Sequence, residues 1–177
     1  MMDTAYPASA HTVSGPVNHD SYTDDYLRAT LALVKTIAMV GASAKEMRPS
    51  YFAMKYLQGK GFRVIPVNPG VAPRPILGET TYPSLSDVPQ PVDMVDIFRD
   101  SAAAGGIVDE ALALPHRPKV IWMQFNVRDD EAAAKAEAAG IRVVMNRCPK
   151  VEYARLNGEL AWQGIDSRVI SSKRRKL

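Results

Sequence analysis

Short apolar runs and amphipathic helical stretches alternate along most of the chain. Five short runs are apolar, and three of them are almost wholly so, as strands buried on both faces of a sheet should be. The predicted strands span residues 36–40, 62–67, 92–98, 119–123 and 141–145. Helical spacing predicts an initial helix over 22–35 and further helices over 51–60 (with Pro49 at its first position), 102–114 and 129–139.

This alternation predicts the fold class. Parallel strands need crossover connections, and a helix after nearly every strand supplies them. We therefore expect an α/β protein with a doubly wound parallel sheet of about five strands, covered by helices on both faces in three α/β/α layers. We find no internal repeat in the sequence.

One connection is much longer than the others. Residues 68–91 separate the second and third strands and hold six of the 13 prolines. Structureless loops of this length are uncommon in compact domains unless they are functional or disordered. The segment starts at the carboxyl end of a strand, where open α/β sheets bind ligands. A stiff wall beside a ligand and a passive spacer remain equally good interpretations.

Charge and composition set the expected domain boundaries. A content of 46% hydrophobic and 23% charged residues is that of a globular protein. The formal net charge is +3, but five basic residues lie in the last ten positions, so residues 1–167 sum to 17 − 19, or −2. We expect a flexible N-terminal arm over 1–21, a single domain over 22–166 and a basic tail over 167–177.

The same features limit the partners that we expect. The basic tail is a solvated terminus or an import or nucleic-acid patch, and the body lacks a basic and aromatic stripe, so nucleic acid is not an expected partner. No apolar run approaches the roughly 18 residues of a membrane span, and the first 30 residues lack the pattern of a secretory leader. With Cys148 as the sole cysteine, we expect a cytoplasmic protein without internal disulfides.

The turn after the first strand carries the strongest local signal. Gly41 allows the backbone to approach an anion closely, and Pro49 begins a helix whose free N–H groups favour negative charge. Ser43, Arg48 and Ser50 add donors. The functional interpretation is a pyrophosphate site, and the structural alternative is a tight turn before a helix. The full G-x-G-x-x-G pattern of dinucleotide-binding proteins is absent.

The end of the second strand bears on which nucleotide fits. Enzymes that use NAD usually place an acid there to hold the ribose hydroxyls, whereas this chain has Val67-Asn-Pro-Gly70 with Arg74 nearby. A neutral strand end beside a cation accommodates a phosphorylated ribose. NADP and coenzyme A both carry such a phosphate, so this position does not separate them.

An ordered series of motifs resembles a known family. The motifs are Val40-Gly-Ala-Ser43, Arg48-Pro-Ser-Tyr51, Val64-Ile-Pro-Val-Asn-Pro69, Val95-Asp-Ile-Phe-Arg99, Trp122-Met-Gln124 and Ala139-Gly-Ile-Arg-Val-Val-Met-Asn-Arg-Cys148. Over roughly residues 36–156 they resemble small stand-alone CoA-binding-domain proteins, which are similar to the nucleotide-binding domain of the succinyl-CoA ligase alpha subunit. The resemblance implies a Rossmann-like fold with coenzyme A or an acyl-CoA across the carboxyl ends of the strands.

The resemblance also assigns residues to the ligand. The turn would hold the pyrophosphate, residues 67–69 would border the adenosine and its 3′-phosphate, and residues 98–99 would line the adenine or pantetheine side. The expected ligand-binding residues are Gly41, Ala42, Ser43, Arg48, Ser50, Tyr51, Val67, Asn68, Pro69, Arg74, Phe98, Arg99, Gln124 and Cys148. Two positions depart from the family pattern: Glu46 stands where members often have proline, and Asn126 where many have glycine.

The sequence offers no convincing catalytic constellation and no metal site. Cys148 beside Arg147 has the form of an activated thiolate, but a buried apolar role explains it better, because no histidine is close in sequence. Asp93 and Asp96 point to opposite faces of their strand and do not form a pair. We therefore expect a non-catalytic binding or regulatory protein. An NAD(P)-dependent oxidoreductase, a ligase-like accessory subunit and a module that binds a partner or a second copy remain alternatives.

Overall fold

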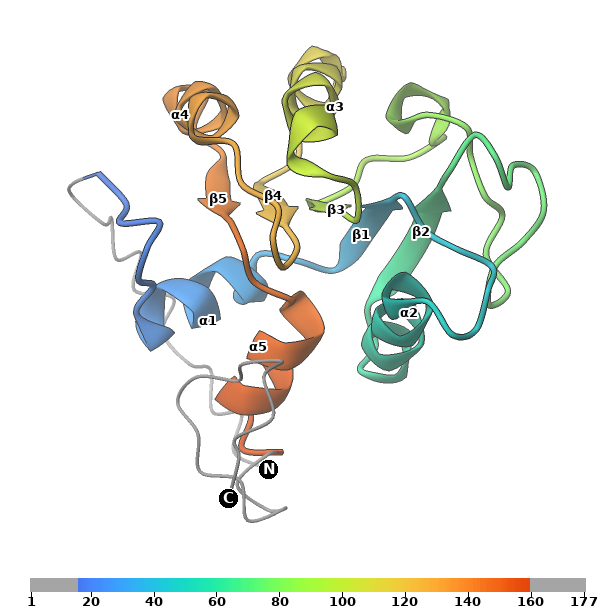
Figure 1. Cartoon of the computed structure of the whole chain (residues 1–177), viewed down its shortest axis with the longest axis horizontal. Coiled ribbons are helices and arrows are strands. Elements are labelled where there is room, and N and C mark those ends of the chain that lie inside the picture. Colours follow the sequence, from blue (N-terminus) through green and yellow to red (C-terminus); the bar gives the residue numbers. More distant parts are fainter. Residues whose placement is uncertain (1–15, 160–177) are drawn as a thin grey trace, which may run out of the picture.

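The structure is a computed structural model that describes residues 16–159 (Figure 1). Five parallel strands form one sheet in the order β2-β1-β3-β4-β5. The strands are β1 (Thr36–Val40), β2 (Arg63–Val67), β3 (Met94–Ile97), β4 (Val120–Met123) and β5 (Arg142–Val144). The helices are α1 (Asp24–Ala32), α2 (Pro49–Gly59), α3 (Ser101–Ala113), α4 (Asp130–Ala138) and α5 (Pro149–Leu156), with a short 3₁₀ helix η1 (Leu85–Asp87).

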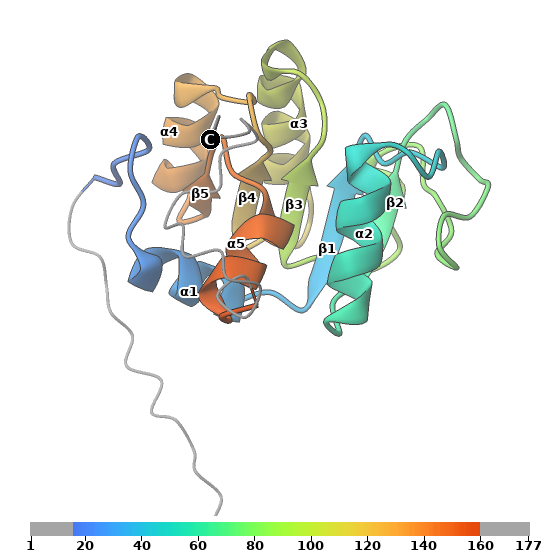
Figure 2. The ribbon, with the colours of Figure 1, turned by 60° about the horizontal axis from the view of Figure 1, so that its bottom comes forward.

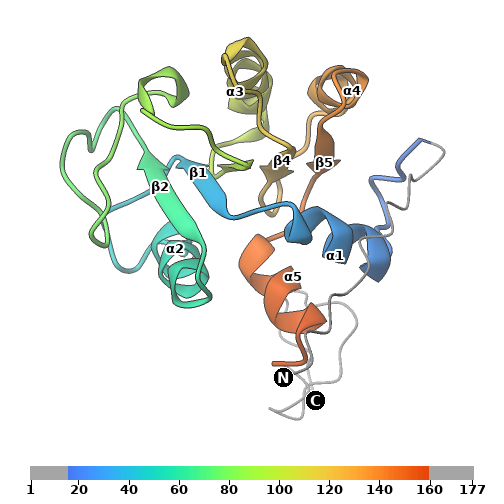
Figure 3. The same ribbon diagram turned by 180° about the vertical axis from the view of Figure 1, so that it is seen from behind.

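Helices cover both faces of the sheet, so the predicted three-layer, doubly wound fold is confirmed. Figures 1 and 3 show α3 and α4 on one face and α1, α2 and α5 on the other. Alternate residues of each strand enter the two resulting cores. On β3, for example, Val95 and Ile97 pack with α3 and α4, whereas Met94 packs with α1 and α2. The chain builds the sheet outward in one direction from β1 to β2 and in the other from β3 to β5. The point where this order reverses lies between β1 and β3, and sheets of this kind bind ligands there.

The local signals placed most helices correctly. Thr23 caps α1 by accepting a hydrogen bond from the N–H of Tyr26, and Asp100 caps α3 in the same way through the N–H of Ala103. Pro49 occupies the first turn of α2, as predicted. The sequence analysis did not predict α5, a helix of eight residues that begins at Pro149 and buries few large side chains.

Both edges of the sheet are covered by tyrosines. At the β5 edge, the Tyr26 hydroxyl donates to the carbonyl of Val143 at 3.0 Å, and the N–H of Met145 donates to the Tyr22 hydroxyl at 2.7 Å. At the β2 edge, the backbone of Tyr82 pairs with that of Pro66 and Asn68. The long connection 68–91 is therefore not structureless, since it returns along β2 and then forms η1.

The predicted arm and tail lie largely outside the described part of the chain. Of the arm over 1–21, residues 16–21 are described, and there the His19 ring lies 2.8 Å from the Tyr22 hydroxyl. The predicted tail over 167–177 lies wholly outside the described residues. None of the helices in the described range is long and apolar enough to cross a membrane.

Candidate functional site

The turn after β1 is shaped by a close approach between two backbone segments. Gly41 has a φ of +87°, a region that other residues rarely adopt. A Cβ atom at this position would lie 2.3 Å from the carbonyl oxygen of Phe98 and 3.0 Å from the Cδ of Arg99. Gly41 is therefore required by the packing of the turn against the end of β3, and this contact brings Phe98 and Arg99 to the turn.

The turn leads directly to the first residues of α2. The buried Ser50 hydroxyl accepts a hydrogen bond from the N–H of Ser43 at 3.1 Å, which ties the start of the helix to the turn. Arg48 is the N-cap residue of α2, and its side chain is exposed. The first turn of a helix presents N–H groups that its own carbonyls do not satisfy. An exposed guanidinium therefore lies where an anion is favoured.

The end of β2 is held beside the same turn. The Asn68 side-chain amide donates to the carbonyl of Ala42 at 2.8 Å, and its oxygen accepts from the N–H of Gly70 at 2.8 Å. Val67 is buried in the core, whereas Pro69 and Arg74 are exposed. A neutral amide thus occupies the position at which an acid would hold a ribose hydroxyl.

A cavity of about 600 Å³ opens between the N-terminal ends of α2 and α5. These helices contact each other on the same face of the sheet (Figure 2). The lining side chains come from both helices and from the carboxyl ends of β3 and β4: Met47, Pro49, Phe52, Ala53, Phe98, Arg99, Gln124, Phe125, Asn126, Val127, Cys148, Lys150 and Val151. Its size and mostly apolar wall are typical of small-molecule sites.

The predicted site residues fall into three groups. Phe98, Arg99, Gln124 and Cys148 line the cavity. Most of the others surround the turn beside it, namely Gly41, Ala42, Ser43, Arg48, Ser50, Val67, Asn68 and Pro69. The remaining two do not line the cavity: Tyr51 packs against the core beneath α2, and Arg74 is exposed in the long loop.

Sequence reasoning missed the apolar wall of the cavity. Met47, Phe52 and Phe125 are exposed large apolar side chains, and all three line it. One signal was available in the sequence. Ala53 and Met54 face the core, so Phe52 lies on the outer face of α2, where a polar residue is the usual choice. Asn126, noted as a departure from the family pattern, lines the cavity with a φ of +64°, a conformation that asparagine tolerates better than most residues.

A buried carboxyl group lies beneath the floor of the cavity. Asp96, in the middle of β3, is wholly buried, and its Oδ1 accepts a hydrogen bond from Nε2 of Gln124 at 2.9 Å. Among the described residues, its other oxygen has no hydrogen-bond partner. Burial raises the pKa of Asp96 to about 7. The bond fixes the amide of Gln124, which itself lines the cavity.

The Cys148 thiol is a poor nucleophile in this setting. It is buried at the N-cap position of α5, and burial raises its pKa to about 11, against the opposing effect of the backbone N–H groups of Val151 and Lys150. The guanidinium of Arg147 lies 5.5 Å from the centre of the Tyr22 ring and donates to the carbonyl of Asn146. The neighbouring cation is thus engaged elsewhere, and the thiol behaves as a small wall group.

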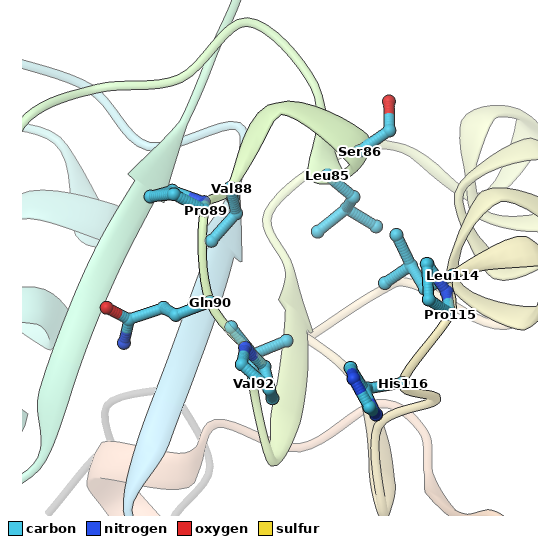
Figure 4. A pocket seen from close by; sticks show the side chains of 10 residues that line it. Leu85, Ser86, Val88, Pro89, Gln90, Val92, Leu114, Pro115 and His116 are labelled. Atoms are coloured by element: carbon cyan, nitrogen blue, oxygen red, sulfur yellow. The ribbon is translucent and has the colours of Figure 1, made fainter.

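A second cavity, of about 410 Å³, lies at the opposite, amino-terminal ends of β3 and β4 (Figure 4). Leu85 of η1 and Leu114 at the end of α3 lie on facing sides of it, and His116 is the sole titratable side chain in its lining. Its described lining holds no glycine and no carboxylate, and the helix that begins there, η1, is a single 3₁₀ turn.

Comparison with known proteins shows the family. The family model described as the CoA binding domain matches residues 35–154. The chain is 33% identical over 128 residues to the protein YneT of Bacillus subtilis (strain 168), covering 72% of this chain and 92% of YneT. A solved structure of a Thermus thermophilus protein, ID.343, is 41% identical, with a TM-score of 0.71, and the match covers 76% of this chain and 99% of that one.

A larger enzyme contains a related segment. Acetate–CoA ligase [ADP-forming] II of Archaeoglobus fulgidus is 35% identical over 111 residues, which are 62% of this chain but 16% of the ligase. The similarity to the ligase therefore concerns one segment of it and not the whole enzyme. The family match covers well over half of the chain and includes the turn, the cavity and all five strands. The chain belongs to the CoA binding domain family.

Proposed function

We propose that the protein binds coenzyme A or an acyl-CoA reversibly, as a binding or regulatory protein. One observation carries the proposal: the turn with Arg48 at a helix N-terminus lies next to the mostly apolar cavity that ends at Gln124 and Cys148. A ligand with a polyanionic head and a long neutral arm matches this arrangement. The family to which the chain belongs supports the same ligand class.

Each part of coenzyme A has a group to receive it in this proposal. The pyrophosphate lies against the first turn of α2, where the N–H groups and the Arg48 guanidinium favour negative charge. The ribose phosphate lies near Asn68, with Arg74 in the loop beyond it. The pantetheine arm enters the cavity past Phe98 and Arg99.

The described residues favour binding over catalysis. The Cys148 thiol is buried, and its pKa of about 11 leaves almost no thiolate at neutral pH. Asp96 is wholly buried and does not line the cavity, and its hydrogen bond is to the lining residue Gln124. An oxidoreductase that uses NADP is the main competing function, because a ribose phosphate alone does not distinguish the two ligands.

Side-by-side calorimetric titrations test the proposal. Coenzyme A should bind about five- to thirtyfold more tightly than 3′-dephospho-CoA, since one partly exposed phosphate contact contributes on the order of 1 to 2 kcal/mol. The difference should shrink as salt rises, because exposed charge pairs are screened. NAD and NADP serve as controls. If NAD or NADP binds more tightly than coenzyme A at both low and high salt, the proposal is wrong and an oxidoreductase becomes the better interpretation.

A further inference from the structure

Exposed apolar side chains gather at one place on the described surface. The exposed large apolar residues of residues 16–159 are Leu33, Met47, Phe52 and Phe125. Three of these four line the cavity between α2 and α5, with exposed fractions of 91% for Met47, 53% for Phe52 and 39% for Phe125. They come from the segment before α2, from its first turns and from the segment after β4. Apolar groups grouped in this way around an opening indicate an apolar ligand.

The inner wall of the cavity has the same character. The buried Ala53 of α2 and Val127 beyond β4 belong to it, with the half-buried Val151 of α5. Most of the exposed wall is apolar, and the polar groups in the lining belong to Arg99, Gln124, Asn126, Lys150 and Cys148, whose thiol is protonated at neutral pH. A bound thioester would meet no activated nucleophile on Cys148, so the cavity is suited to holding an acyl group without transferring it.

We propose that this cavity binds the acyl group of an acyl-CoA, so that the protein distinguishes aliphatic acyl thioesters from free coenzyme A. The inference rests on the proposed function and names its preferred ligand class. The head of the ligand remains at the turn with Arg48, and the aliphatic chain lies against Phe52 and Phe125, covered by Met47. Burial of the chain and of these three side chains supplies the preference.

A series of acyl lengths tests the inference by calorimetry. Free, acetyl-, butyryl-, hexanoyl- and octanoyl-CoA are titrated into the same protein preparation. Affinity should rise about three- to fourfold for each added methylene, because each buried methylene contributes about 0.8 kcal/mol, until the chain outgrows the cavity. Equal affinity for all five ligands overturns the inference and leaves the proposed function intact. Failure of all five to bind removes the proposed function as well.

Two variants connect the effect to the cavity. Phe52→Ser should reduce the ratio of octanoyl-CoA affinity to free CoA affinity by about fivefold or more, because a large part of the apolar wall is lost. Leu33→Ser removes the exposed apolar side chain that does not line the cavity, and it should leave the ratio unchanged. A ratio that falls equally in both variants would overturn the inference.

A second copy of the chain is the competing occupant of this surface. Analytical ultracentrifugation of the wild type and of Phe52→Ser separates the two cases. We expect the same oligomeric state for both proteins, with or without octanoyl-CoA. A dimer that Phe52→Ser dissociates, together with equal affinities along the acyl series, would show that the apolar side chains form an interface between copies.

Discussion

The side-chain amide of Asn68 donates a hydrogen bond to the main-chain carbonyl of Ala42 at 2.8 Å. This bond joins the end of β2 to the turn after β1, and the Asn68 oxygen is occupied by the N–H of Gly70. Both functions of the amide are therefore used within the protein. An aspartate at position 68 would lack the N–H group that donates to Ala42, and its negative charge would lie beside the proposed phosphate site.

Asn68→Asp should lower the affinity for coenzyme A about tenfold or more, because it removes a donor and adds a negative charge close to a bound phosphate. Asn157→Asp is a matched control at the far end of α5, where, within residues 16–159, the side-chain amide donates to the carbonyl of Tyr153. The control should bind as the wild type does. If calorimetry gives the two variants the same affinity for coenzyme A, the ribose phosphate does not bind near Asn68.

Arg48→Ala should weaken coenzyme A binding by roughly 1.5 to 3 kcal/mol, the usual range for a hydrogen bond to a charged group. The side chain is exposed, so the free energy of unfolding should change little. Arg117→Ala, at the opposite end of the sheet, removes another exposed arginine and should leave binding unaltered. Unaltered affinity of Arg48→Ala would exclude this guanidinium from the site.

Gly41→Ala should lower the free energy of unfolding by on the order of 2 to 4 kcal/mol, since the new Cβ meets the Phe98 carbonyl at 2.3 Å in a strained backbone region. Gly106→Ala is the control, because a Cβ at that position in α3 meets nothing within 4 Å. It should stabilise the protein by about 0.5 to 1 kcal/mol. Urea denaturation of both variants measures the difference, and a neutral Gly41→Ala would contradict the close approach.

The strands and helices were predictable because their signals are local. Apolar runs mark strands buried on both faces, helical spacing marks the helices, and Pro49 marks a helix start through its fixed dihedral angle. α5 lacked such a signal, since its eight residues bury chiefly Pro149, Glu152, Ala154 and Leu156. The packing of the whole fold, not local pattern, stabilises a helix of this length.

The site was predictable in part, for a similar reason. The turn has a sequence signature, so Gly41, Arg48 and Asn68 could be named as candidates, and the structure places them at one turn. The cavity depends on how α2 and α5 pack across the sheet, and this packing brings together Phe52, Phe125 and Val151 from distant segments. Asp96 was discounted because it could not pair with Asp93, yet its burial and its bond to Gln124 became visible only with the sheet assembled.

Cys148 should react slowly with a disulfide reagent in the native protein. Burial raises the pKa of its thiol to about 11, so the rate should rise with pH through the range from 8 to 11 as the thiolate forms. The chain unfolded in guanidinium is the control, because its single cysteine then reacts at the rate of a free thiol. Rapid native reaction at pH 7 would show that the thiol is activated.

The same assignment predicts the outcome of a substitution. Cys148→Ser should keep the affinity for coenzyme A within a few-fold of the wild-type value, since the sulfur contributes only to the wall of the cavity. Circular dichroism verifies that the variant is folded. Complete loss of binding by a folded variant would give the thiol a direct role in holding the ligand.

Asp96 should make the stability of the protein depend on pH. Burial raises its pKa from 3.8 to about 7, so the folded protein holds the proton more tightly than the unfolded chain between these values. Wild-type stability should therefore fall, through this group, as pH rises from about 4 to 7. Asp96→Asn lacks the titration, so its stability relative to the wild type should increase over that range by on the order of 3 kcal/mol.

Denaturant unfolding of both proteins at several pH values between 4 and 8 measures this difference, and their other titrating groups cancel in the comparison. The asparagine oxygen can still accept from Nε2 of Gln124, so the variant keeps the bond that fixes this amide beside the cavity. A difference that stays constant from pH 4 to 8 would mean that Asp96 titrates at its ordinary value. The carboxyl would then have to meet solvent or a further donor, contrary to its complete burial.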